Sequence, residues 1–201
     1  PSQSPNLRKR KPPPRRLSPI VPLTKIGPIH RFPKVRMSRN PSRGPRLAPL
    51  QFVEFFNPLS PNSKALHQFR KAIFEKYPGN VRWRILFNPQ VGGDQGYYLS
   101  KALHVAREMG GFWEMLDQLM LQPSTGSYNH KQLVTLAGKA RINLQGFDVR
   151  MQNPLTKVML DRDMRIGYSI KSSGLSVLYL NGAQMRPPWS RTKLMQAAKL
   201  A

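Results

Sequence analysis

Cysteine is missing from all 201 residues of the chain. Its absence excludes a disulfide scaffold, a cysteine-ligated zinc or iron–sulfur site, and a thiol nucleophile. Metal ligands of other kinds are scarce too, because only nine residues are acidic and the four histidines lie far apart in the sequence. No spacing typical of a metal motif places two histidines on one helix face. We therefore expect no metal site and no cofactor.

Long hydrophobic runs are also absent. A helix that crosses a bilayer needs about 20 consecutive, mainly apolar residues. No stretch of this sequence approaches that length without charged or polar interruption. We therefore expect that the chain does not span a membrane.

Acidic residues are absent from the first 50 positions, where the sequence has 13 of its 33 lysines and arginines and 12 of its 20 prolines. The whole chain has a formal charge of +24. A segment this basic and proline-rich has too little apolar surface to offset the entropy lost on ordering, so residues 1–49 are predicted to form an extended tail. Residues 50–201 are numerous enough for a normal hydrophobic core.

The tail has the features of a nucleic-acid-binding segment. Proline fixes the backbone in an extended form, and cations spaced along such a backbone suit a series of phosphates. A retained transit peptide fits less well, because its amphipathic helix is incompatible with this proline density. A solvated basic linker stays open as an alternative. The predicted RNA-binding residues are Arg8, Lys9, Arg10, Lys11, Arg15, Arg16, Lys25, Arg31, Lys34, Arg36, Arg39, Arg43 and Arg46.

Hydrophobic periodicity after residue 50 predicts an α/β domain. The expected order is β-α-β, then a group of helices, then α-β-β-α. The first group comprises a strand at 51–56, a helix at 62–77 and a strand at 81–87. The helical group comprises segments at about 97–109, 112–121 and 129–141, and the last group a helix at 153–168, strands at 175–180 and 183–186, and a helix at 189–200.

This order, together with three local matches, resembles the DsbA-like form of the thioredoxin fold, in which a helical insertion separates the two halves. The matches are FVEFFNPLSPNSKAL, ALHVAREMGGFWEMLDQLM and LYLNG. They are similar to that family's first strand, active-site turn and first helix, to its helical insertion, and to its late strand followed by Asn-Gly. The resemblance covers residues 50–200 and implies a thioredoxin-like domain at 50–201 with its insertion at about 97–141.

The residues at the implied active site depart from the family pattern. Ser60 and Ser63 stand where the family has the two cysteines of Cys-Pro-x-Cys, and Ser176 stands where a cis-proline is expected. A serine nucleophile needs an adjacent base. Glu54 lies inside a predicted strand and His67 on the expected polar side of a helix, so neither is placed to serve. We therefore expect a degenerate, non-catalytic site at the three serines, without a small-molecule substrate.

A second resemblance assigns a role to the first serine. Kappa-class glutathione transferases and the related chromene-carboxylate isomerases are also DsbA-like, and some are mitochondrial. They use a Ser-Pro-x-Ser-like turn in which the first serine hydroxyl hydrogen-bonds the glutathione thiol. Ser60 matches that position. Glutathione-dependent chemistry at Ser60 is thus an alternative to the non-catalytic site.

The basic tail and the degenerate domain together favour a structural protein of a large ribonucleoprotein. Mitochondrial ribosomes have taken in enzyme-like folds, so the sequence-based hypothesis is a mitochondrial ribosomal protein in the mitochondrial matrix, in contact with rRNA and neighbouring ribosomal proteins. An accessory subunit of a mitochondrial membrane complex is a further alternative.

One feature of the domain itself is left open by the sequence. Arg82 and Arg84 alternate with Trp83 on a strand that reads as an edge strand. This pattern fits either a solvated face or a contact with RNA.

Overall fold

The computed structural model describes residues 40–90, 92–123, 127–170, 175–185 and 191–200. Most of the predicted basic tail, residues 1–39, lies outside these ranges.

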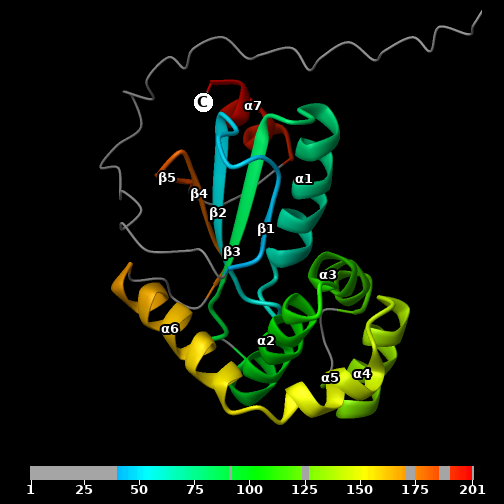
Figure 1. The fold of residues 1–201 in the computed structure, drawn as a ribbon. Helices are drawn as coiled ribbons and strands as arrows, with labels where there is room; N and C mark the ends of the chain where they lie inside the picture. The colour runs from blue at the N-terminus through cyan, green and yellow to red at the C-terminus, as the bar shows by residue number, and fades with distance from the viewer. Residues whose placement is uncertain (1–39, 91, 124–126, 171–174, 186–190, 201) are drawn as a thin grey trace, which may run out of the picture.

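A five-stranded mixed sheet forms the centre of the described chain (Figure 1). Its spatial order is β1-β3-β2-β4-β5. The long strands β2 and β3 are parallel, and every other neighbouring pair is antiparallel. The strands are β1 (Ser42–Arg43), β2 (Leu50–Phe56), β3 (Val81–Phe87), β4 (Val177–Leu180) and β5 (Ala183–Met185).

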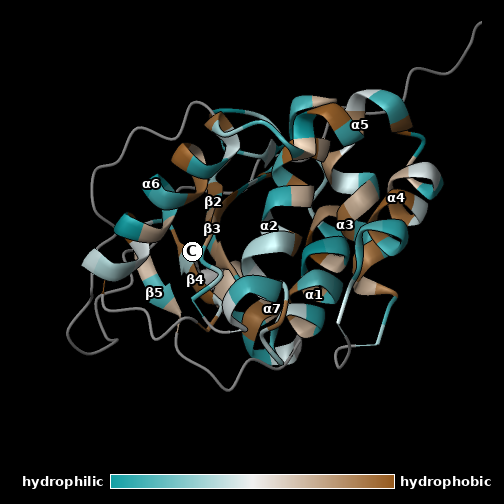
Figure 2. Cartoon of the chain, turned by 90° about the horizontal axis from the view of Figure 1, so that it is seen from below, coloured by the Kyte–Doolittle hydropathy of each residue, from teal (hydrophilic) through white to brown (hydrophobic). Residues whose placement is uncertain are grey.

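Helices cover both faces of the sheet (Figures 1 and 2). Helices α1 (Ser63–Lys76) and α7 (Arg191–Leu200) lie on one face, and α6 (Leu155–Ser169) lies on the other. The remaining helices gather at the end of the sheet where β2 and β3 finish (Figure 1). They are α2 (Gly93–Glu108), α3 (Phe112–Met120), α4 (His130–Lys139) and α5 (Leu144–Met151).

The face beneath α1 carries the larger part of the core. Phe52 of β2 stacks on Trp83 of β3 with ring centroids 4.6 Å apart, and Phe69 of α1 meets both rings edge-on. All three side chains are buried. Offset and edge-on ring pairs of this kind add about 0.5–1.5 kcal/mol each beyond the burial of their area. This aromatic group fixes α1, and the turn that precedes it, against the sheet.

The predicted element order and α/β class are confirmed, with differences at weakly patterned segments. The structure adds β1, which two prolines flank, and α5, whose eight residues are too few for a clear period. The sheet thus extends ahead of residue 50, and the helical insertion runs from about residue 93 to 151 rather than 97 to 141. Within the described ranges, no helix is both long and apolar enough to cross a membrane.

Gly44, which follows β1, is expected to be essential for the edge of the sheet. Its φ is +90°, and a Cβ built there would lie 1.9 Å from the Val81 carbonyl oxygen. Gly44→Ala should therefore cost more than the roughly 1–3 kcal/mol of strain that a left-handed non-glycine residue carries. Gly182→Ala is the control, because φ is +85° there and no atom lies within 4 Å of the added Cβ. Equal losses in urea melts of the two variants would contradict a steric role for Gly44.

Candidate functional site

The turn between β2 and α1 holds the first predicted site residue. Asn57 builds this turn: its carbonyl oxygen accepts the Ser60 N–H at 3.1 Å, and its side-chain oxygen accepts the Leu59 N–H at 2.9 Å. The Ser60 carbonyl then accepts the N–H of Ser63, the first residue of α1, at 3.0 Å. These bonds place Ser60 directly ahead of the helix.

Three serine hydroxyls predicted from the resemblance meet at this turn, although Ser176 is more than 100 residues away in sequence. The Ser63 hydroxyl donates to the Asn57 carbonyl. Its oxygen is 2.9 Å from that of Ser176, so Ser176 is the donor in that pair. Ser176 also accepts the Asn57 N–H at 3.2 Å. The hydroxyls of Ser63 and Ser176 are thereby satisfied.

Ser60 differs from its two neighbours. Its oxygen accepts the Ser176 N–H at 3.3 Å, but no acceptor for its own hydroxyl hydrogen is found among the described residues. The Ser60 residue is 3% exposed. Within the described ranges, the turn thus holds one buried hydroxyl whose hydrogen has no acceptor.

The start of α1 adds a favourable environment for negative charge. Its N-cap residue, Asn62, makes no side-chain capping bond, and the first turn of the helix has no acidic residue. The amide groups of a helix N-terminus carry a partial positive charge that such residues would otherwise offset. An anion beside Ser60 would therefore be stabilised.

An ionic network lies beneath the turn, on the same face of the sheet. Glu54 of β2 is fully buried, and one of its carboxylate oxygens accepts hydrogen bonds from Arg70 and Trp83, each at 2.8 Å. The other oxygen has no partner among the described residues. Burial raises the pKa of Glu54, and the positive charge of Arg70 lowers it in part.

Arg70 extends this network toward the surface. Its guanidinium group lies over the rings of Trp83 and Trp113, at 5.6 and 5.4 Å. A second guanidinium nitrogen is 2.8 Å from Nδ1 of His67, whose Nε2 is 3.4 Å from Asp117. The expectation that His67 lies on the polar side of its helix is wrong, because the residue is buried against Arg70 and the helical insertion. The one sequence signal of this network was Glu54, a charged residue within the apolar run QFVEFF.

Of the predicted RNA-binding residues, only Arg43 and Arg46 lie within the described ranges. Those from Arg8 to Arg39 lie outside the described ranges. The structure separates the remaining two: Arg43 lies over the Phe74 ring at 5.3 Å, whereas Arg46 is close enough to Arg84 to lower the pKa of that residue. No group of three histidine or acidic residues that could hold a metal is found in the described part of the chain.

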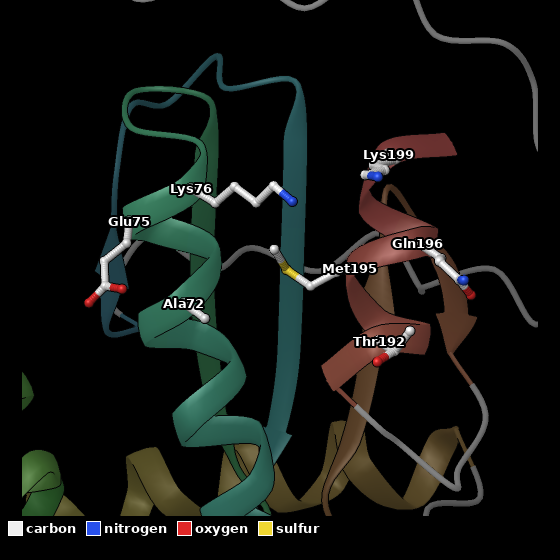
Figure 3. A pocket seen from close by; sticks show the side chains of 7 residues that line it. All are labelled: Ala72, Glu75, Lys76, Thr192, Met195, Gln196 and Lys199. Carbon is white, nitrogen blue, oxygen red and sulfur yellow. The ribbon is translucent and has the colours of Figure 1, made fainter.

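A surface groove of about 470 Å³ lies between α1 and α7 (Figure 3). It is lined by Ala72, Glu75, Lys76, Thr192, Met195, Gln196 and Lys199. The lining residues of α1 begin nine positions after Ser63, roughly 13 Å along the helix axis. The groove is therefore separate from the serine turn.

No family model and no curated protein match the chain, but solved structures do. Oxidised BdbD from Bacillus subtilis aligns with a TM-score of 0.70 at 16% identity, covering 82% of this chain and 95% of that one. The thiol-disulfide exchange protein α-DsbA2 from Wolbachia pipientis aligns with a TM-score of 0.71 at 11% identity, and the alignment covers 81% of this chain and 87% of that one. A thioredoxin-like oxidoreductase from Silicibacter pomeroyi aligns with a TM-score of 0.66 at 17% identity, and the alignment covers 80% of this chain and 91% of that one. The chain has the predicted DsbA-like thioredoxin fold.

The comparisons contradict the functional hypothesis drawn from the sequence. The solved structures that share the fold include a thiol-disulfide exchange protein and an oxidoreductase, not ribosomal proteins, so the interpretation as a structural component of a mitochondrial ribosome is wrong. The prediction that the chain is not an enzyme is contradicted by the same finding. The chain nevertheless has no cysteine with which to perform thiol-disulfide exchange itself.

Proposed function

We propose that this chain binds a thiol ligand as a glutathione-dependent transferase or isomerase does, with the Ser60 hydroxyl as hydrogen-bond donor to the ligand sulfur. The observation that carries the proposal is the Ser60 hydroxyl, which has a hydrogen without an acceptor among the described residues, while Ser63 and Ser176 are satisfied. The DsbA-like fold and the position of Ser60 ahead of α1 support it.

Two features of the turn favour the ionised form of a bound thiol. A hydrogen bond from a hydroxyl to a charged sulfur is stronger than one to a neutral group. The uncapped N-terminus of α1 contributes partial positive charge at the same place. Both lower the pKa of the bound thiol, whose proton leaves to solvent. The chain thus supplies an environment for the thiolate, and the ligand supplies the nucleophilic sulfur.

The burial of Ser60 sets a condition on binding. With the residue 3% exposed, a sulfur atom reaches the hydroxyl only when the turn opens. The apparent affinity is then reduced by the fraction of the protein in the open state.

None of these observations bears on the location of the protein in the cell. The mitochondrial matrix therefore stays a prediction.

Calorimetry of the full chain with reduced glutathione tests the proposal. We expect saturable binding that Ser60→Ala weakens about tenfold or more, the usual effect of losing a hydrogen bond to a charged group. Ser100→Ala is a matched control, because Ser100 is also buried but its hydroxyl has no partner among the described residues. S-methylglutathione, which has no ionisable thiol, should bind more weakly than glutathione.

Two results would overturn the proposal. One is the absence of any binding by the folded wild-type chain at millimolar glutathione. The other is equal affinity of wild type and Ser60→Ala, since the ligand sulfur would then not contact this hydroxyl.

A further inference from the structure

The sheet face opposite α1 carries two arginines of β3. Along this strand Val81, Trp83 and Ile85 are buried in the main core, so Arg82 and Arg84 point to the other face. The register places Arg82 beside Gln51 and Arg84 beside Val53 of β2. Helix α6 packs farther along the same face, where Ile166 and Ile170 cover the cluster formed by Val53, Phe55, Leu86 and Tyr179.

Arg82 is held in place by β1 and the glycine that follows it. Its guanidinium group donates to the Gly44 carbonyl at 2.6 Å and to the Ser42 hydroxyl at 2.9 Å. Its Nε is buried and has no partner among the described residues. None of these partners carries a negative charge, so the charge of Arg82 is fixed at this edge without being neutralised.

The Arg84 side chain is partly buried and makes no hydrogen bond or ion pair within the described part of the chain. Burial lowers its pKa, and the neighbouring charges of Arg82 and Arg46 lower it further. No carboxylate contributes an opposing effect. The charge of Arg84 is therefore repelled by two neighbouring guanidinium groups. We name Arg46, Arg82 and Arg84 the arginine surface.

The chain itself provides no acidic residue for this surface. Residues 1–50 contain no aspartate or glutamate, so neither the β1 segment nor the chain ahead of it can supply one. All nine acidic residues of the chain lie in the described ranges, and no ion pair joins one of them to Arg46, Arg82 or Arg84. A partly buried charge without a partner is unfavourable, so an anion supplied by another molecule would stabilise this surface.

We propose that the arginine surface binds the phosphate backbone of a nucleic acid. Guanidinium forks match phosphate oxygens in pairs, so each of the three groups can take a phosphate of its own, which a single small anion does not supply. A polyanion with regularly spaced charges fits better. It also matches the 11 further cations of residues 1–39, which continue directly into β1 without an intervening acid. This surface lies on the opposite sheet face from α1, so the proposal is independent of thiol binding at Ser60.

The test measures binding of the full chain to a fluorescent 20-nucleotide RNA by anisotropy, across a salt titration. Arg84→Gln should lower the slope of log affinity against log salt by about 0.7–0.9, the value for one lost phosphate contact, and Arg46→Gln/Arg84→Gln by about twice that. The matched control is Arg150→Gln, which removes one exposed charge from α5 at the far end of the molecule. The tail is retained in every variant, so its own contribution cancels.

Three outcomes would overturn the proposal. The first is a slope unchanged in the double variant, and the second is an equal change in Arg150→Gln, which would reflect net charge alone. The third is a double variant that no longer binds anionic lipid vesicles but still binds RNA as the wild type does, which would assign the surface to a membrane. Folding does not confuse the comparison, because removing the repulsion at Arg84 should leave the melting temperature unchanged or higher.

Discussion

Replacing Arg70 by methionine is expected to destabilise the fold by about 3–5 kcal/mol, the usual cost of removing one partner from a buried ion pair. The Glu54 carboxylate is fully buried and would keep only the Trp83 N–H, 2.8 Å away, because its second oxygen has no partner in the described part of the chain. Protonation of Glu54 limits the cost, because burial already raises the pKa of this group. The loss is large beside the 5–15 kcal/mol that stabilises a typical domain.

The double variant Glu54→Gln/Arg70→Met identifies the cause of that loss. Glutamine keeps an oxygen for the Trp83 N–H but carries no charge, and methionine keeps much of the contact with the two tryptophan rings. We expect most of the lost stability to return in urea denaturation at pH 7. A double variant as unstable as Arg70→Met alone would mean that Arg70 contributes by packing rather than by charge. If Arg70→Met does not fold while the double variant does, the charge explanation stands.

The network shows where sequence reasoning reaches its limit. The strand at 81–87 was predicted with its observed bounds and α1 to within a residue at each end, because their apolar periods are strong. The role of Arg70 depends on how α1 lies across β2 and α3, and no local pattern records that. His67 was assigned to the polar side of α1 for the same reason: its neighbours Arg70 and Asp117 come from packing.

The serine site was located differently. Ser60, Ser63 and Ser176 were named because of a resemblance that aligned them with a known site, and the structure brings all three together. Resemblance did not indicate which hydroxyl has no acceptor among the described residues, since that depends on the bonds made by Asn57. The arginine surface could be predicted from the sequence only in part, because the alternation around Trp83 placed two of its three arginines on one face of the strand. The third, Arg46, comes after β1, a strand that the sequence did not predict, and lies close enough to Arg84 to lower the pKa of that residue.

Stability should fall as the pH is lowered from about 6.5 to about 4, and His67 is the reason. Arg70 donates to Nδ1 of His67, so the neutral ring has its hydrogen on Nε2, facing Asp117. Protonation would put a second hydrogen on Nδ1, directed at the guanidinium group. Burial, together with the charge of Arg70, lowers the pKa of His67 from 6.5 to about 4, although Asp117 opposes that shift.

The sign and size of the effect follow from this shift. The unfolded chain takes up the proton near pH 6.5, whereas the folded chain takes it up only near pH 4. The stabilisation is therefore complete above pH 6.5, decreases through the interval, and is lost below it. A shift of this size corresponds to about 3 kcal/mol. Raised pKa values at Glu54 and Asp163 act in the opposite direction, so the informative quantity is the difference between wild type and variant.

His67→Gln isolates this contribution, because glutamine offers Arg70 an oxygen acceptor that does not titrate. Urea denaturation from pH 4 to 8 should show a variant whose stability depends less on pH, with the curves diverging from wild type between pH 6.5 and 4. His104→Gln is the companion variant, since His104 is also buried with a lowered pKa but contacts Glu108 instead. Parallel curves for wild type and His67→Gln across the interval would show that His67 is not held neutral by Arg70.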